Sequence, residues 1–129
     1  MTIITAYAWT NEHDYDVRHD FFTDLLAFTR TCASHGPTIL LGDFNARILQ
    51  RFPGEDHVLG EYVFQNPRGK WAPTSSRELL LELCEACEAI VANTFFNTGV
   101  ESKITYHDLG VQPCEPICPG RFEPVSYTH

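Results

Sequence analysis

A carboxylate and a carboxamide leave the end of a short apolar run together in this sequence. Residues 39–41 predict a strand that is buried on both faces, and Gly42, Asp43, Phe44 and Asn45 follow it. In an extended segment, Asp43 and Asn45 lie on one face and Phe44 anchors the other. A carboxylate there can take a proton or orient a water, and an amide can donate to a phosphoryl oxygen or hold the carboxylate still. The alternative is a plain strand-end turn, since Gly, Asp and Asn are common turn formers.

Two strands and an intervening helix would position these side chains. Residues 2–8 are β-branched and predict a first strand, residues 17–34 predict a helix, and residues 38–41 form the second strand. If the strands are parallel, their carboxyl ends share one edge of the sheet, where α/β proteins bind ligands. Tyr7 and Asp43 would then meet at that edge. The expected buried stripe of the helix consists of Phe21, Leu25, Phe28 and Cys32, widened by Phe22 and Leu26.

The second half of the chain alternates loops with short elements. Residues 47–74 are rich in Gly, Pro and polar residues and lack a period, which is typical of a functional or mobile loop. Its basic and aromatic side chains either contact a polyanion or are simply solvated; they are Arg51, Arg68, Lys70 and Trp71. The run Ser75-Ser76-Arg77-Glu78 predicts a capping box that opens a second helix. Further strands are predicted at residues 89–92, 103–106 and 121–127, the last interrupted by Pro124.

The composition is that of an ordinary globular domain. The chain has 129 residues, of which 43% are hydrophobic and 20% charged, enough for one domain with a modest core. A net charge of −8 opposes a purely electrostatic grip on nucleic acid, although a bound metal ion inverts the local field. Neither a membrane-spanning run nor a signal peptide is found. We therefore expect an intracellular protein, nuclear or cytoplasmic, without membrane contact.

The five cysteines admit two interpretations. Cys84 and Cys87, together with Cys114 and Cys118, can be drawn as a zinc site. The favoured alternative is that Cys84 and Cys87 pack as small hydrophobic residues, because both fall within a helical pattern. The odd number of cysteines also argues against a disulfide framework.

Several segments, in order along the chain, resemble the endonuclease/exonuclease/phosphatase superfamily, and in particular the endonuclease domains of LINE-type retrotransposons. Residues 42–46 match the family's G-D-F-N-A, and residues 4–8 resemble its V-Y-A-P strand end, with Trp9 in place of proline. Three further segments are similar to retroelement-type members: residues 78–96 to a helix-strand segment, residues 103–106 to a K-x-T-[WY] strand, and residues 121–123 to the lead-in to a Q-[IL]-D-[YF] strand.

This resemblance implies an α/β fold that is part of a four-layer α/β sandwich, with two packed mixed sheets flanked by helices. It implies Mg²⁺-dependent phosphodiester hydrolysis, with Mn²⁺ as a substitute, by a DNA-nicking endonuclease of a retroelement. Asp43 would bind the metal and manage the attacking water, Asn45 would donate to the phosphate or brace Asp43, and Tyr7 would donate to a phosphate oxygen. Thr105 and Tyr106 would lie at the DNA surface, with Tyr106 stacking on a base or sugar; packing is the alternative for both.

The resemblance also implies that residues 1–129 are the central fragment of one such domain. The family's metal-binding glutamate would precede Met1, and its S-D-H segment would follow His129. Pro124-Val125-Ser126 stands where the family has Q-[IL]-D, so that aspartate is missing. Residues 125–129 look like a translated sequencing adapter, and we expect them to be non-native. The chain as given is therefore expected to be inactive and poorly stable.

Two other functions remain open from the same residues. The superfamily includes phosphatases of inositol phosphates and other small phosphoesters, which the acidic balance of the chain suits no worse. A catalytically dead nucleic-acid-binding remnant is the third interpretation, because the metal ligands are few. The helix-strand segment at residues 78–96 favours the nuclease.

Overall fold

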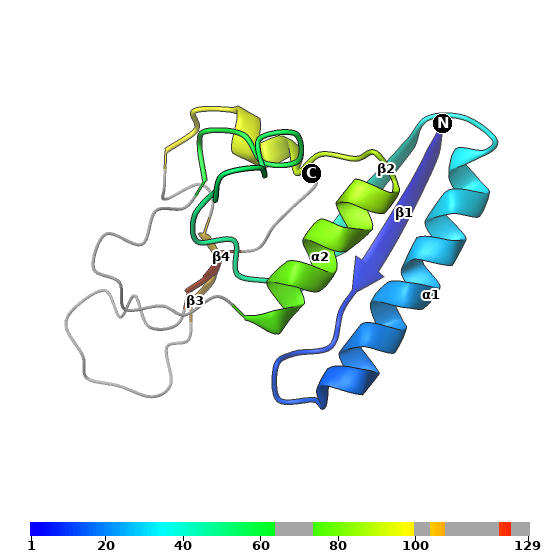
Figure 1. The fold of residues 1–129 in the computed structure, drawn as a ribbon, viewed down its shortest axis with the longest axis horizontal. Coiled ribbons are helices and arrows are strands. Elements are labelled where there is room, and N and C mark those ends of the chain that lie inside the picture. Colours follow the sequence, from blue (N-terminus) through cyan, green and yellow to red (C-terminus); the bar gives the residue numbers. More distant parts are fainter. Residues whose placement is uncertain (64–73, 100–103, 108–121, 125–129) are drawn as a thin grey trace.

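The computed structural model describes residues 1–63 and 74–99, and the backbone of residues 104–107 and 122–124. The fold is a mixed α/β arrangement (Figure 1). Its elements are β1 (Thr2–Tyr7), α1 (Tyr15–Ala33), β2 (Thr38–Asp43), α2 (Ser75–Ala86), the 3₁₀ helix η1 (Ala92–Phe95), β3 (Ile104–His107) and β4 (Phe122–Pro124). Among the described residues, no helix combines the length and apolar character needed to cross a membrane.

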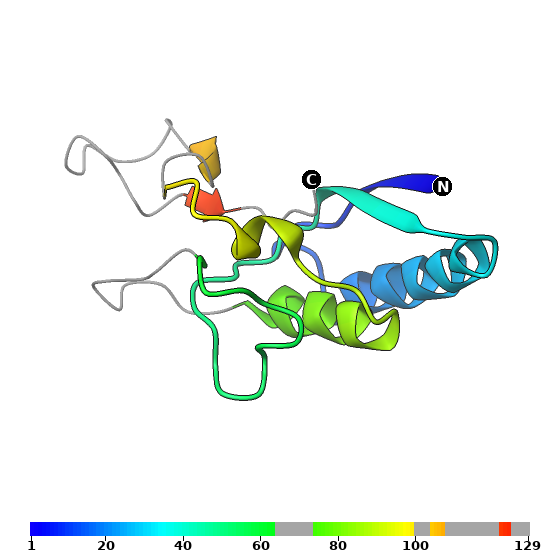
Figure 2. The ribbon, with the colours of Figure 1, turned by 90° about the horizontal axis from the view of Figure 1, so that it is seen from above.

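The predicted strand-helix-strand unit is confirmed. β1 and β2 pair in parallel, in a register that runs from Thr2 opposite Thr38 to Tyr7 opposite Asp43. Both α1 and α2 lie on the same side of this two-stranded sheet (Figure 2). Among the described residues, the helices therefore cover one face of the sheet and leave the other without a helical cover.

The alternation of exposed and buried side chains along β1 follows from this one-sided cover. Ile4 and Ala8 are buried in the core, whereas Ile3 and Tyr7 are exposed on the other face. The prediction that residues 39–41 are buried on both faces is wrong: Ile39 is 39% exposed, and its two successors are only half-buried. The physical reason is that both helices pack on the same face of the sheet.

Most of the apolar stripe predicted for α1 is confirmed, because Phe22 and Leu25 are buried and Phe21, Leu26 and Cys32 pack against the core. The buried residues of α1 are Arg18, Phe22, Leu25 and Thr29, and Phe28 is 57% exposed. The positions still recur at helical spacing, but two of the four carry polar side chains. The apolar pattern therefore predicts most of the buried face of α1, but it misses Arg18 and Thr29 and wrongly includes Phe28.

The start of α2 also differs from its prediction. The helix begins at Ser75 with Thr74 as its N-cap, and no side chain makes a capping hydrogen bond there. The capping box of Ser75 and Glu78 is therefore not formed. Instead, Ser75 and Ser76 both accept hydrogen bonds from Arg18 of α1.

Residues 89–92 do not form the predicted strand. The N–H of Val91 donates to the carbonyl oxygen of Val58 at 3.0 Å, and residues 92–95 turn into η1. Residues 88–92 and the beginning of β2 instead border a pocket of about 520 Å³. The pocket is lined mainly by apolar side chains from α1, β2 and α2, and it lies at the end of β2 opposite Asp43.

The described part of the predicted long loop is partly packed and partly solvated, since residues 50–54, 56, 57, 61 and 62 are exposed. Ile48, Leu49, Val58 and Leu59 are all buried in the core. Arg51 donates to the carbonyl oxygen of Leu59 at 3.2 Å. The other candidate polyanion contacts in this loop, Arg68, Lys70 and Trp71, lie outside the described residues.

The predicted strands near the end of the chain correspond to β3 and β4, which pair antiparallel. β3 begins at Ile104, one residue later than predicted, and ends at His107. β4 is shorter than predicted and covers Phe122–Pro124.

Candidate active site at the sheet edge

Tyr7 and Asp43 lie side by side at the carboxyl edge of the β1–β2 sheet, as predicted. They are the last pair of the parallel register, and the ladder continues with Ala8 N–H donating to the Asp43 carbonyl oxygen at 2.8 Å. Neighbouring residues in register project from the same face of a sheet. Tyr7 is 72% exposed and Asp43 is half-buried, so both are open to a ligand from outside.

Gly42 holds the two strands close together just before this edge. Its φ of 149° lies in the region that favours glycine, and a Cβ at this position would overlap the carbonyl oxygen of Ala6. The backbone therefore approaches the neighbouring strand closely at Gly42. This close approach fixes the position of Asp43 relative to β1.

Asn45 fastens the end of β2 to the end of β1. Its backbone N–H donates to Asp43 Oδ1 at 3.0 Å, and its side-chain Nδ2 donates to the carbonyl oxygen of Ala8 at 2.7 Å. The residue is 5% exposed and has a φ of 47°, a left-handed conformation that Asn tolerates. Asn45 thus braces the Asp43 carboxylate through its backbone, while its carboxamide bonds within the protein.

Phe44 is fully buried in the core, as the sequence predicts for the aromatic residue behind the site. Residues 42–45 therefore combine both interpretations of the G-D-x-N segment. They form a turn stabilised by the Asp43 side chain, and they leave that side chain at the open edge of the sheet.

Thr105 and Tyr106 belong to β3, and their side chains lie outside the described part of the structure. The prediction that they line a nucleic-acid surface stays a prediction.

Metal ligands are few at this edge. Within the described ranges, no three His, Cys, Asp or Glu side chains gather closely enough to hold a metal ion. Mg²⁺ takes oxygen ligands in octahedral geometry and usually binds one or two carboxylates. Asp43 fits one such ligand position, but it does not by itself make a complete Mg²⁺ site.

The two cysteines of α2 behave as packed hydrophobic residues. Burial, with smaller contributions from Cys87 and Glu85, raises the pKa of the Cys84 thiol to about 12. Burial also raises the pKa of Cys87, against the charge of Arg30. Both shifts are those of thiols packed away from water. Cys114 and Cys118 lie outside the described residues.

A polar cluster between the starts of α1 and α2 was not foreseen from the sequence. Arg18 is 7% exposed and donates from Nη1 to the hydroxyl oxygens of Ser75 (2.7 Å) and Ser76 (2.9 Å). It also donates to Asn11 Oδ1 and to the carbonyl oxygen of His13, both at 3.1 Å. The signal that could have found it is an arginine at a helical spacing from Phe22 and Leu25.

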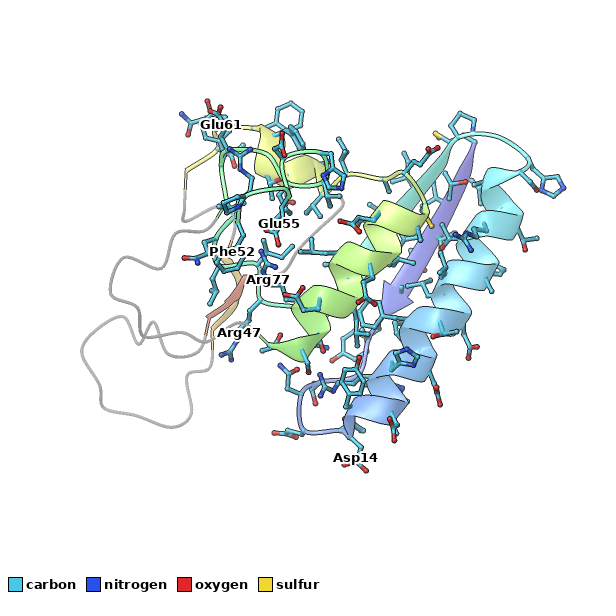
Figure 3. All side chains as sticks on the ribbon, viewed as in Figure 1. Asp14, Arg47, Phe52, Glu55, Glu61 and Arg77 are labelled. Atoms are coloured by element: carbon cyan, nitrogen blue, oxygen red, sulfur yellow. The ribbon has the colours of Figure 1, made fainter. Side chains whose placement is uncertain are left out.

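A second buried arginine joins α2 to the loop that follows β2. Arg77 donates from Nη2 to Glu55 Oε2 at 2.6 Å and from Nη1 to Glu55 Oε1 at 2.8 Å. It also bonds Glu78 and the carbonyl oxygen of Gln50, and its guanidinium lies 4.9 Å from the centre of the Phe52 ring. Figure 3 shows Arg77 between α2 and this loop, close to Glu55 and Phe52.

Comparisons of the chain with family models, with curated proteins and with solved structures found no match.

Proposed function

We propose that this chain is part of a metal-dependent phosphodiesterase, a DNA-nicking endonuclease of the LINE-type retrotransposon class. The observation that carries the proposal is the pairing of Tyr7 with Asp43 at the open carboxyl edge of a parallel sheet. An acidic group and a phenolic hydroxyl in this position suit hydrolysis of a phosphate ester. The order of the family-like segments along the chain supports the nuclease among the superfamily's activities.

The chemistry assigned to the residues of this chain is simple. Asp43 orients a water and accepts its proton as the water attacks phosphorus. Tyr7 donates its phenolic O–H to a non-bridging oxygen of the phosphate. Asn45 maintains the geometry, because it holds both the Asp43 carboxylate and the end of β1. The turn therefore keeps the carboxylate in place.

Mg²⁺, or Mn²⁺ in its place, is the proposed cofactor, and it would neutralise charge on the phosphoryl oxygens when bound. Asp43 is the described residue proposed to contribute a ligand. Because a single carboxylate is too little to hold the ion, we propose that the remaining ligands come from residues of the complete domain.

The four-layer sandwich is proposed on the same grounds. The outer face of the β1–β2 sheet carries exposed Ile3 and Ile39, whose apolar side chains would be covered by a second sheet.

Nicking of supercoiled plasmid DNA tests the function, using the reading frame extended in both directions. We expect Mg²⁺-dependent nicking that falls at least ~10²-fold in Asp43→Asn, because this variant loses the proton acceptor but keeps the oxygen that Asn45 N–H bonds. The matched control is Asp24→Asn, which makes the same change at an exposed position of α1.

Two results would count against the nuclease. Equal nicking by Asp43→Asn and Asp24→Asn would remove Asp43 from the chemistry. Turnover of an inositol phosphate with no nicking would show a small-phosphoester phosphatase instead. The absence of turnover on both substrates, together with retained DNA binding, would identify a catalytically dead binding module.

A further inference from the structure

Arg18 is a buried cation whose hydrogen-bonding partners are all neutral. Its acceptors are two serine hydroxyls, the Asn11 amide oxygen and the His13 carbonyl oxygen. It pairs with no carboxylate among the described residues, and the Tyr15 ring lies 5.8 Å from its guanidinium. Taking a charge out of water without a compensating charge is costly, so such a group is expected to meet an anion.

The start of α2 adds positive potential at the same place. α2 is a 12-residue helix, and no side chain among the described residues caps its N-terminus. Arg77 N–H donates to the Thr74 carbonyl oxygen, and the positive end of the helix dipole lies beside the Arg18 guanidinium. A cation and a helix N-terminus repel one another unless an anion lies between them. The hydroxyls of Ser75 and Ser76 stand at this junction.

The cluster has donors that the protein does not use fully. Within the described residues, Arg18 Nη2 donates to no acceptor. Nη2 is also not fully buried, so it can still be reached from solvent. Asn11 Oδ1 accepts from both Arg18 Nη1 and Ser76 Oγ, at 3.1 and 3.2 Å. The donors Arg18 Nη1 and Ser76 Oγ therefore meet at a neutral oxygen. Because Asn11 is exposed, its side chain can move away and leave this position to another oxygen.

We propose that this cluster of Arg18, Ser75, Ser76 and Asn11 is a phosphate-binding subsite. An oxygen of the phosphate takes the place of Asn11 Oδ1, and Arg18 Nη2 and the first N–H groups of α2 bond its other oxygens. The subsite rests on the proposed function for its ligand, which is a phosphate of the DNA strand other than the one beside Asp43. Its position fits, because the segment from Ala8 to Asp14 joins the end of β1 to the start of α1 (Figure 1).

The surrounding charge sets the expected affinity. Glu12, Asp14 and Asp16 are exposed close to Arg18 in sequence, and they oppose the approach of a free anion. Free phosphate should therefore bind weakly. A phosphate carried by a strand that is already held elsewhere gains from its high effective concentration.

Phosphate titration of the protein from the extended reading frame tests the subsite without metal or turnover. At constant ionic strength and with chloride as the reference anion, we expect saturable NMR shifts at the Ser75 and Ser76 amides and at Arg18 Nε. We also expect phosphate to raise the melting temperature, because it binds only the folded chain. Arg18→Lys should weaken phosphate binding about 10-fold, since lysine lacks the planar fork of donors. Arg30→Lys is the matched control, at an exposed position of the same helix.

A second variant keeps the test decisive if Arg18→Lys disturbs folding. Asn11→Ala removes the competing oxygen and should tighten phosphate binding, while a structural role for Asn11 predicts no gain. Shifts that are equal for phosphate and chloride, or an affinity unchanged in both Arg18→Lys and Asn11→Ala, would overturn the subsite.

The source of the phosphate is separated with two oligonucleotides of the same sequence. If a terminal phosphate is bound, the 5′-phosphorylated strand shifts the Ser75 and Ser76 signals more than the unphosphorylated strand does; equal shifts identify a backbone phosphodiester. Phosphate binding by a protein that does not nick DNA would refute the nuclease and leave the subsite standing. Nicking of DNA without these NMR shifts would refute the subsite and leave the nuclease standing.

Discussion

Arg77 and Arg18 are both buried in this small fold, and their surroundings differ in one respect. Arg77 is 1% exposed and forms a two-pronged ion pair with Glu55. Arg18 is nearly as buried, and its hydrogen-bond acceptors among the described residues are all neutral oxygens. Burial of an arginine therefore says little about its role. The counter-charge of Glu55 makes Arg77 a structural clamp, whereas Arg18, without one among the described residues, can accept an anion.

The Arg77 cluster gives order to a segment without regular secondary structure. Glu55 also accepts a hydrogen bond from the Phe52 backbone N–H at 2.8 Å, so a single carboxylate organises the loop and ties it to α2. The Arg18 cluster ties α1 to α2 by hydrogen bonds alone. We expect the first cluster to contribute more to stability and the second to respond more to ligands.

Arg77→Ala should have the largest effect on folding. It leaves the Glu55 carboxylate largely buried without its partner, which should lower the free energy of unfolding by about 3–5 kcal/mol. Urea denaturation followed by circular dichroism measures the change. Arg30→Ala, at an exposed arginine of α1, should change it little. A loss below about 1 kcal/mol in Arg77→Ala would show that the clamp is dispensable.

Arg18→Met should cost less, about 1–2 kcal/mol, because the acceptors that it leaves are neutral and Asn11 can turn to water. The same urea experiment measures it. The sharper comparison adds phosphate: the anion should stabilise the parent chain and leave Arg18→Met unchanged. If Arg18→Met destabilises as strongly as Arg77→Ala, the contrast between the two arginines fails.

The stability from the Arg77 cluster should depend on acid pH. Burial tends to raise the pKa of Glu55, but hydrogen bonds from Arg77 and from Phe52 N–H, with the charge of Arg77, outweigh it and lower the pKa. A carboxyl with a lowered folded pKa stabilises the fold above its unfolded pKa, and this contribution is lost as the pH falls through the folded pKa. The gap in stability between the parent and Glu55→Gln should thus narrow as the pH is lowered. A constant gap would contradict the assignment.

The rings beside the two arginines should give the smallest effect. Phe52→Leu removes a ring 4.9 Å from the Arg77 guanidinium and should cost about 0.5–1 kcal/mol beyond its packing loss. Tyr15→Leu removes a ring at 5.8 Å from Arg18 and should cost less. Double-mutant cycles with Arg77→Met and Arg18→Met isolate the two coupling energies, and a larger coupling for Tyr15 would reverse the expected order.

Local pattern predicted the part of the fold that forms from neighbours in sequence. The apolar run before Asp43, the short first strand and the helix between them were enough to place Tyr7 beside Asp43. Local pattern failed where contacts with residues distant in sequence determine the structure. Arg18 bonds a serine 57 residues away and Arg77 a glutamate 22 residues away, and neither partner leaves a periodic signal. Residues 89–92 likewise have the composition of a strand, but Ala89 N–H bonds the Cys84 carbonyl of α2 and Val91 N–H bonds the Val58 carbonyl of the loop.

The Asn45 turn shows the same limit within the site. The spacing of Asp43 and Asn45 predicted an extended backbone with both side chains on one face, which is wrong. The left-handed conformation of Asn45 turns its carboxamide toward Ala8. That conformation depends on the carbonyl of a residue 37 positions earlier, which local spacing does not contain.

The buried thiol of Cys84 makes the opening of α2 measurable. A thiol that is 4% exposed, with a pKa of about 12, reacts with an alkylating agent only after α2 has separated from the core. The rate of Cys84 modification therefore reports how often this helix opens. Ligands that bind Ser75 and Ser76 should slow the modification of Cys84. The modification rate of the half-buried Cys32 on α1 is the reference for the rest of the chain.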